Sequence, residues 1–208
     1  YLKNIEPVAQ PGSADLAAIV GWLNTRLPDD VIVTNGAGNY AGFVHRFFQY
    51  RGFRTQLAPT NGSMGYGVPS AVAAKIAAPG RMVVSFSGDG CFLMNGQEFS
   101  TAVQHGAHIV FIVVDNGMYG TIRMHQERDY PTRVHGTELK NPDFAAYARA
   151  FHGHGETVEK TEDFAAAFER CVAIGKPSII HIKTDAEAIT SRITLTKLRE
   201  QSLAKQKH

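Results

Sequence analysis

An aspartate and an asparagine that each follow an apolar run have the residue types best suited to chemistry. Asp89 stands between two glycines directly after the run 82–86, and Asn116 lies in the polar segment that follows the run 109–114. If both runs are strands of an open parallel sheet, their carboxyl ends form the edge where ligands bind. A carboxylate and an amide oxygen suit Mg²⁺, which completes its shell with phosphate oxygens and water. The pair therefore predicts a magnesium site that also holds a phosphate ester.

Glycines beside these residues would let backbone amides approach a phosphate. Gly88 and Gly90 flank Asp89, and the N-terminus of a helix expected after them favours anions. Alone, this turn is as consistent with a plain acidic turn as with a phosphate site. Asn116 favours a phosphate site. One helix and one strand are expected between Asp89 and Asn116, so the loops that carry them should be neighbours at one edge of the sheet. The loop 61–65 adds a third segment, placed before a small-residue helix.

Helical and strand-like patterns alternate along the chain, which predicts a parallel sheet covered by helices on both faces. The expected strands are 31–34, 56–58, 82–86, 109–114, 157–159 and 178–183. The expected helices are 15–27, 40–50, 65–78, 95–105, 162–174 and 194–207. Asn95 and Glu98 form a capping-box pattern, and Asn141-Pro142 is expected to open one more helix with proline at its first position. The fold class is α/β, a three-layer α/β/α sandwich with a mainly parallel central sheet.

Composition indicates an ordinary globular domain. The chain has 208 residues, 44% of them hydrophobic and 19% charged, and its formal net charge of +2 does not favour nucleic acid as a partner. Two cysteines are too few for a disulfide framework, so a cytoplasmic location is expected. No segment approaches the roughly 20 apolar residues of a membrane span. The chain begins with Tyr1 rather than Met, and we expect a linker at 1–13, a domain at 14–190 and a helical tail at 191–208, as the C-terminal part of a longer polypeptide.

The segment from Gly88-Asp89-Gly90 to Asp115-Asn116 resembles the diphosphate-binding motif of thiamine diphosphate enzymes, which runs from GDG to an Asn pair. The loop 62–65, Gly-Ser-Met-Gly, also resembles the segment beneath the bent cofactor in that family. The resemblance covers nearly the whole chain and implies the C-terminal, diphosphate-binding domain of the group that contains acetolactate synthases, benzoylformate decarboxylases and pyruvate decarboxylases. Asp115 replaces the first Asn of the pair, which leaves the metal-binding second position intact.

The resemblance implies a role for each matching position. Asp89, the side chain of Asn116 and the backbone oxygen of Met118 would bind Mg²⁺, and the diphosphate would close its shell. Met64 would lie between the two cofactor rings, and the Gly62 carbonyl would accept a hydrogen bond from the cofactor amino group. The other expected contacts to thiamine diphosphate are Gly36, Ala37, Gly38, Asn39, Gly88, Gly90, Cys91, Tyr119 and Gly120. The protein positions the cofactor, which supplies the ylid chemistry itself.

The implied function is the diphosphate- and Mg²⁺-binding half of a 2-oxo acid decarboxylase or carboligase, similar to acetolactate synthase. The activating glutamate of the family belongs to a pyrimidine-binding domain of the same or another subunit, and nothing in this chain matches it. We therefore expect no catalytic residue here, no turnover by this chain alone, and a homodimer or homotetramer. The alternative is a separate non-catalytic subunit of a split enzyme that is active only with a partner chain.

The substrate is not predicted. By the resemblance, His125 stands where acetohydroxyacid synthases carry tryptophan, and Ile122 where pyruvate decarboxylases carry glutamate. An apolar Ile122 is closer to the benzoylformate decarboxylase arrangement, and it is the expected substrate-pocket residue. The segment 123–128 fits either the lining of the substrate entrance or a solvated helix face.

Two other enzyme classes fit less well. A phosphatase of the haloacid dehalogenase type needs a nucleophilic aspartate just after the first strand, whereas Asp29 and Asp30 precede the run 31–34 and Asn35 follows it. A dinucleotide-binding Rossmann domain needs a G-x-G-x-x-G segment that opens a helix after the first strand, and none occurs there.

Outside their motif context, Met64 would be a core methionine and Cys91 a small buried side chain.

Overall fold

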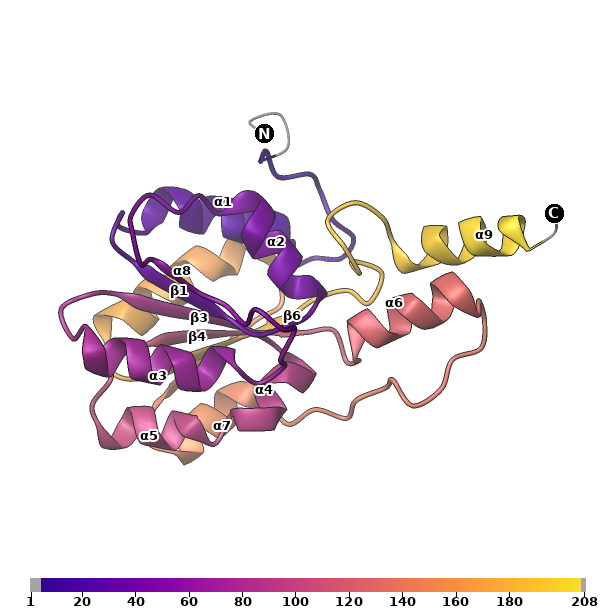
Figure 1. Ribbon diagram of the computed structural model, residues 1–208. Coiled ribbons are helices and arrows are strands. Elements are labelled where there is room, and N and C mark those ends of the chain that lie inside the picture. The colour runs from indigo at the N-terminus through magenta and orange to yellow at the C-terminus, as the bar shows by residue number, and fades with distance from the viewer. Residues whose placement is uncertain (1–4, 207–208) are drawn as a thin grey trace.

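The computed structural model describes residues 5–206 and centres on a parallel six-stranded sheet (Figure 1). The strand order is β2-β1-β3-β4-β6-β5, and every pairing is parallel. The strands are β1 (Ile32–Asn35), β2 (Gln56–Leu57), β3 (Val83–Gly88), β4 (Val110–Asp115), β5 (His154–Val158) and β6 (Ser178–Lys183). All six expected strands form, and the last has the expected bounds.

Helices cover both faces of the sheet, which confirms the three-layer α/β/α architecture. One face carries α1 (Leu16–Arg26), α2 (Asn39–Phe47) and α8 (Thr161–Ala173). The other carries α3 (Gly67–Ala77), α4 (Asp89–Asn95), α5 (Glu98–Gln104) and α7 (Phe144–Ala150). β3 is buried along its whole length and β4 along all but its last residue, as expected for strands covered on both sides.

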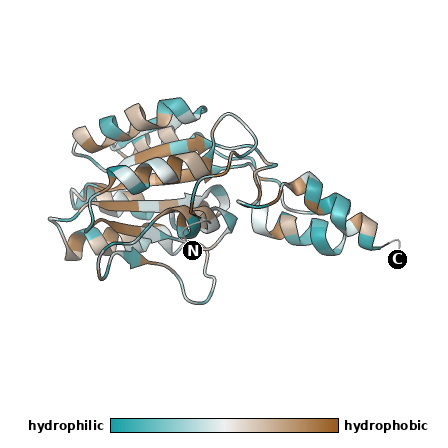
Figure 2. Cartoon of the chain, turned by 90° about the horizontal axis from the view of Figure 1, so that it is seen from above, coloured by the Kyte–Doolittle hydropathy of each residue, from teal (hydrophilic) through white to brown (hydrophobic). Residues whose placement is uncertain are grey.

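The pair formed by α6 (Gly120–Asp129) and α9 (Leu195–Lys205) projects beyond the sheet. Figure 2 shows that hydrophobic residues gather in the sheet, whereas these two helices are largely hydrophilic. α6 was not among the expected helices, although a solvated helix face was one of the two readings of 123–128, because its sequence carries no apolar stripe.

The sheet opens a crevice between β1 and β3. The chain leaves β1 for β2 on one side and returns to the other side of β1 at β3. α2 follows β1 onto one face and α4 follows β3 onto the other (Figure 1). The two loops therefore diverge at the carboxyl ends of these strands, which is where open α/β sheets bind ligands.

The start predicted for the helix over 95–105 is wrong, because two short helices, α4 and α5, occupy this region. α4 begins directly at Asp89 and ends at Asn95, whose side chain donates to the Gly65 carbonyl at 3.1 Å rather than capping a helix. α5 begins at Glu98 and has no side-chain cap. The turn between the two helices stays helical at Gly96, where a Cβ would lie 2.5 Å from the Phe92 ring, so no extended cap residue forms.

The helix expected from Asn141-Pro142 starts later than predicted. α7 begins at Phe144, and Asp143 caps it by accepting from the amides of Ala145 and Ala146 at 2.9 and 3.0 Å. Pro142 thus precedes the cap instead of occupying the first helical position. Asn141 is unavailable as a cap because its side chain donates to Asp89 and Asp115.

Parts of the expected linker and tail, residues 1–4 and 207–208, lie outside the described residues. Among the helices that the structure describes, none combines the length and the apolar character needed to cross a membrane.

Candidate functional site

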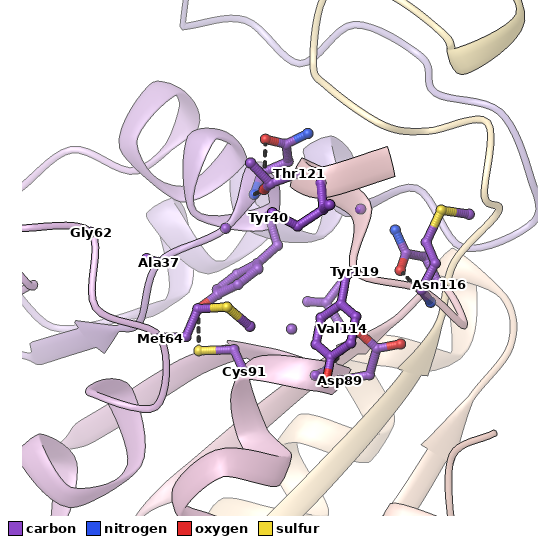
Figure 3. A pocket seen from close by; sticks show the side chains of 17 residues that line it. Ala37, Tyr40, Gly62, Met64, Asp89, Cys91, Val114, Asn116, Tyr119 and Thr121 are labelled. Atoms are coloured by element: carbon purple, nitrogen blue, oxygen red, sulfur yellow. Dashed lines mark hydrogen bonds between the residues drawn. The ribbon is translucent and has the colours of Figure 1, made fainter. Parts of the chain in front are cut away.

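A cavity of about 220 Å³ opens at the carboxyl ends of β1, β3 and β4. Four loops that are far apart in the sequence supply its walls (Figure 3). The lining residues are Ala37, Gly38, Asn39, Tyr40, Gly62, Met64, Gly88, Asp89, Gly90, Cys91, Val114, Asn116, Met118, Tyr119, Gly120, Thr121 and Ile122. The structure thus brings together all the residues expected to contact the cofactor except Gly36. That glycine stands behind the wall, where its N–H donates to the Phe86 carbonyl at 3.4 Å.

The Asp89 carboxylate is buried at the start of α4, with only 3% of the residue exposed. Its Oδ1 accepts from the Gly90 amide at 2.8 Å. Its Oδ2 accepts from the Gly117 amide at 3.0 Å and from Asn141 Nδ2 at 2.8 Å. The carboxylate is therefore held in one orientation while it lines the cavity.

Asp115, at the end of β4, is the second acid beneath the cavity. Its Oδ1 accepts from Asn141 Nδ2 at 2.7 Å and from the Gly117 amide at 2.9 Å. His181 of β6 lies 2.8 Å from Oδ2 through its Nε2 and is only 3% exposed. His181 is therefore a buried residue that contacts an acid rather than a surface group.

The two acids have opposite pKa shifts. Burial raises the pKa of Asp89 to about 6, and the Asp115 carboxylate adds to this increase. Burial also acts to raise the pKa of Asp115, but hydrogen bonds, first that from His181, outweigh it and lower the pKa to about 2. Asp89 is therefore the acid whose negative charge is poorly compensated, and a bound cation would stabilise that charge.

Asn116 and its neighbours form a rigid loop after β4. Asn116 Oδ1 accepts from the Met118 amide at 3.2 Å, which leaves its second lone pair available. Gly117 has a φ of +69°, a conformation that other residues rarely adopt. An isolated antiparallel bridge between Met118 and Glu138 fixes the loop from outside. Asp89, Asn116 and Met118 all line the cavity.

The opposite wall is apolar and contains Met64, Tyr40 and Cys91. Figure 3 shows Met64 pointing into the cavity beside the Tyr40 ring, facing Tyr119 and Asp89. The Tyr40 hydroxyl donates to Cys91 Sγ at 3.2 Å, and the Gly65 amide donates to the same sulfur at 3.1 Å. Burial raises the pKa of Tyr40 well above its ordinary value, so the hydroxyl keeps its proton.

Sequence reasoning missed three lining residues, namely Tyr40, Val114 and Thr121. Thr121 Oγ1 accepts from the Asn39 amide and donates to Asn39 Oδ1, both at 3.0 Å, and so ties α6 to the first residue of α2. Tyr40 and Thr121 each directly follow a residue that was expected to contact the cofactor. This adjacency in the sequence was the only sign that they line the cavity.

At Glu127, the segment 123–128 neither lines the cavity nor forms a solvated helix face. This glutamate is buried and accepts from Arg123 at 2.6 Å and from Arg199 at 2.7 Å. None of the segment's residues lines the cavity.

The donor set fits Mg²⁺ with a diphosphate better than a protein-only metal cage. Within residues 5–206, no three His, Cys, Asp or Glu side chains could hold a metal ion together. The cavity instead offers one carboxylate and one amide oxygen, and Mg²⁺ is usually bound by one or two carboxylates plus substrate phosphates. Glycine also leaves the space open: a Cβ on Gly88 would lie 2.9 Å from the Tyr40 ring.

Known proteins resemble this chain over most of its length. The family described as "Thiamine pyrophosphate enzyme, C-terminal TPP binding domain" matches residues 36–182. Acetolactate synthase isozyme 2 large subunit of Escherichia coli (strain K12) is 31% identical over 178 residues, which are 84% of this chain and 32% of that protein. Sulfoacetaldehyde acetyltransferase of Castellaniella defragrans is 31% identical over 72% of this chain and 25% of that protein.

A solved structure has a similar fold. It is the thiamine diphosphate-dependent 4-hydroxybenzoylformate decarboxylase of Rhodococcus jostii RHA1, with a TM-score of 0.80 and 27% identity over 86% of this chain and 34% of that chain. The present chain spans about a third of the length of these proteins, or less.

Proposed function

The chain belongs to the thiamine pyrophosphate enzymes, as their C-terminal TPP-binding domain, and we propose that its cavity binds thiamine diphosphate through Mg²⁺. We further propose that it forms half of the active site of a 2-oxo acid decarboxylase or carboligase. The observation that carries the proposal is the meeting of Asp89, Asn116 and Met118 in one cavity. Their oxygens would hold Mg²⁺, which in turn would hold the diphosphate.

The walls suit the two ends of this cofactor. The amides of Gly90, Cys91, Tyr119 and Gly120 would face the diphosphate, and the N-terminus of α6 adds a favourable dipole for an anion. Met64 would pack between the two rings, and the Gly62 carbonyl would accept from the amino group. The loop 36–39 would approach from the other side. When bound, the cofactor would supply the carbanion chemistry needed to act on a 2-oxo acid.

The activating carboxylate is proposed to come from elsewhere. Among the described residues, no glutamate lines the cavity. This supports a site completed by a pyrimidine-binding domain of the same or a neighbouring subunit, in a homodimer or homotetramer. A separate subunit of a split enzyme is the second arrangement, and gel filtration with and without the partner chain distinguishes the two.

For the substrate, we propose only the chemical class of the 2-oxo acid. Ile122 lies at the cavity with 52% of its surface exposed, so its apolar side chain faces the space where a substrate would enter. This supports a 2-oxo acid with an apolar substituent and gives the chain no acid or base at that position.

Calorimetry of thiamine diphosphate binding tests the metal bridge. In the protein assembled with its pyrimidine-binding domain, we expect tight binding with Mg²⁺ and a large loss in EDTA. Asp89→Ala and Asn116→Ala should cause a similar loss because each removes a metal ligand. Asp29→Ala is the matched control, since this carboxylate is 79% exposed and pairs only loosely with Arg51. Equal binding by the wild type in Mg²⁺ and in EDTA would refute the metal bridge.

A further inference from the structure

The side chain of Asn141 joins the two acids beneath the cavity, although it does not line the cavity itself. Its Nδ2 donates to Asp89 Oδ2 at 2.8 Å and to Asp115 Oδ1 at 2.7 Å. We propose that Asn141 is a positioning residue that holds the Asp89 carboxylate ready for Mg²⁺. This inference rests on the proposed function and adds a supporting shell that the motif residues alone do not include.

The orientation of the Asn141 amide follows from its neighbours. Both contacts are carboxylate oxygens, which accept hydrogen bonds when ionised, so the side chain must present its nitrogen to them. Its oxygen then points away, and it is buried without a hydrogen-bond partner among the described residues. An unpaired buried acceptor is costly. That cost is tolerated here because the amide makes two charge-assisted bonds at once.

Asp115 is in turn fixed from its far side, so it can act as the anchor of the bridge. His181 Nε2 contacts Asp115 Oδ2 at 2.8 Å. The His181 ring packs edge-on against Phe144, with centroids 5.1 Å apart and an interplanar angle of 87°. Because β6 and α7 hold the histidine, the Asp115 carboxylate is kept in place, and its Oδ1 anchors the Asn141 side-chain nitrogen.

A second bridge runs parallel to the first and includes the neighbouring proposed ligand. The Gly117 amide lies 3.0 Å from Asp89 Oδ2 and 2.9 Å from Asp115 Oδ1, the same two oxygens that Asn141 contacts. Gly117 directly follows Asn116 in the chain. The two bridges therefore fix Asp89 and Asn116 relative to each other, so the cation meets ligands that are already arranged. Supporting residues of this kind typically affect metal affinity by about 10- to 100-fold.

Asn141→Leu is the direct test, because leucine keeps the volume and removes both donors. In the protein assembled with its pyrimidine-binding domain, and with thiamine diphosphate present, we expect Mg²⁺ affinity to fall roughly 10- to 100-fold. The electron paramagnetic resonance spectrum of Mn²⁺ bound in place of Mg²⁺ should also change, because Asp89 is no longer held in one orientation. Asn24→Leu is the matched control: it also loses a tertiary bond, from the Gln49 amide at 2.8 Å, but it lies on α1.

The control separates positioning from general stability. A purely structural role would lower the melting temperature of both variants and leave Mg²⁺ affinity and the Mn²⁺ spectrum unchanged. Wild-type affinity and an unchanged spectrum in Asn141→Leu would overturn the inference while the proposed function stands. Failure of the wild type to bind thiamine diphosphate with Mg²⁺ would overturn the proposed function and the inference together.

A measurement on the wild type covers the case in which the variant does not fold. In the ligand-free protein, the side-chain amide protons of Asn141 should be protected from exchange with solvent, because both carboxylates accept from them. Rapid exchange of these protons, comparable to that of an exposed asparagine, would overturn the inference.

Discussion

Two glycines with opposite surroundings show how tightly single residues shape the cavity. A Cβ on Gly90 would lie 2.5 Å from Cε1 of Tyr119, whereas one on Gly80 would meet no heavy atom within 4 Å. Gly90 therefore lets the ring of Tyr119 lie directly on the turn that carries Asp89. The backbone of Gly90 is helical, so glycine is needed here for this close approach and not for a left-handed conformation.

Gly90→Ala is expected to destabilise the protein by about 1–3 kcal/mol, because Tyr119 must move to admit the methyl group. Gly80→Ala should change stability by no more than about 0.5 kcal/mol, as is usual for open surface positions. Urea unfolding of both variants measures the difference. Equal stability of the two would mean that Tyr119 yields without cost and that the close approach is unimportant.

At the residue scale, the sequence indicated the proposed metal ligands but not the residues that support them. Asp89 and Asn116 could be predicted because each stands at a strand end within a short motif. Asn141 and His181 could not, because they reach Asp115 across 26 and 66 positions of sequence. Asn141 even carries a misleading local signal, since Asn-Pro usually marks a helix start.

Among the elements, α6 and α9 are joined by a buried charge. Arg199 donates from α9 to Glu127 through Nε at 2.8 Å and Nη2 at 2.7 Å, and Arg123 adds a bond within α6. The Arg199 bonds, with further help from Thr132 and Arg123, lower the pKa of Glu127 from 4.5 to about 2. The first turn of α6 lines the cavity, so this ion pair also anchors part of the site.

The stabilisation by Glu127 is expected to depend on pH. Because the folded pKa lies below the ordinary value, the contribution is complete above pH 4.5 and is lost as the pH falls toward 2. A shift of this size corresponds to about 3 kcal/mol. Glu127→Gln should therefore be less stable than the wild type at pH 7, with a difference that shrinks below pH 4.5.

Denaturant unfolding across this pH range measures the difference between the two proteins. Glu162→Gln is a suitable control, since Glu162 lies exposed in the first turn of α8. A gap between wild type and Glu127→Gln that stays constant from pH 7 to pH 2 would contradict the assignment.

The elements themselves were largely predictable, and the exceptions have physical reasons. β4 is a continuous apolar run up to Asp115, and β3 is mainly apolar with two buried serines, as is typical of a parallel sheet covered on both faces. α6 lacks an apolar stripe, and its one fully buried residue is a glutamate paired across 72 positions. The start of α5 was misplaced because Asn95 bonds to a distant backbone carbonyl, which no local pattern shows.

For the molecule as a whole, we expect the isolated chain to be inactive. Mixed with thiamine diphosphate, Mg²⁺ and pyruvate, it should release no CO₂ above background, because no glutamate lines the described part of the cavity. Adding a pyrimidine-binding domain that carries the activating glutamate should allow turnover with a suitable 2-oxo acid. Robust decarboxylation by the pure chain would contradict the proposed division of the site between two domains.

The position of β6 has a consequence for synthesis on the ribosome. β6 lies between β4 and β5, and β5 pairs with no other described strand. β5 therefore cannot join the sheet until β6 has emerged. Asn141 is synthesised 26 residues after Asp115, and His181 is synthesised 66 residues after it. A nascent chain therefore carries Asp89 and Asp115 before either partner exists, and the support of the two acids is completed only when β6 has emerged.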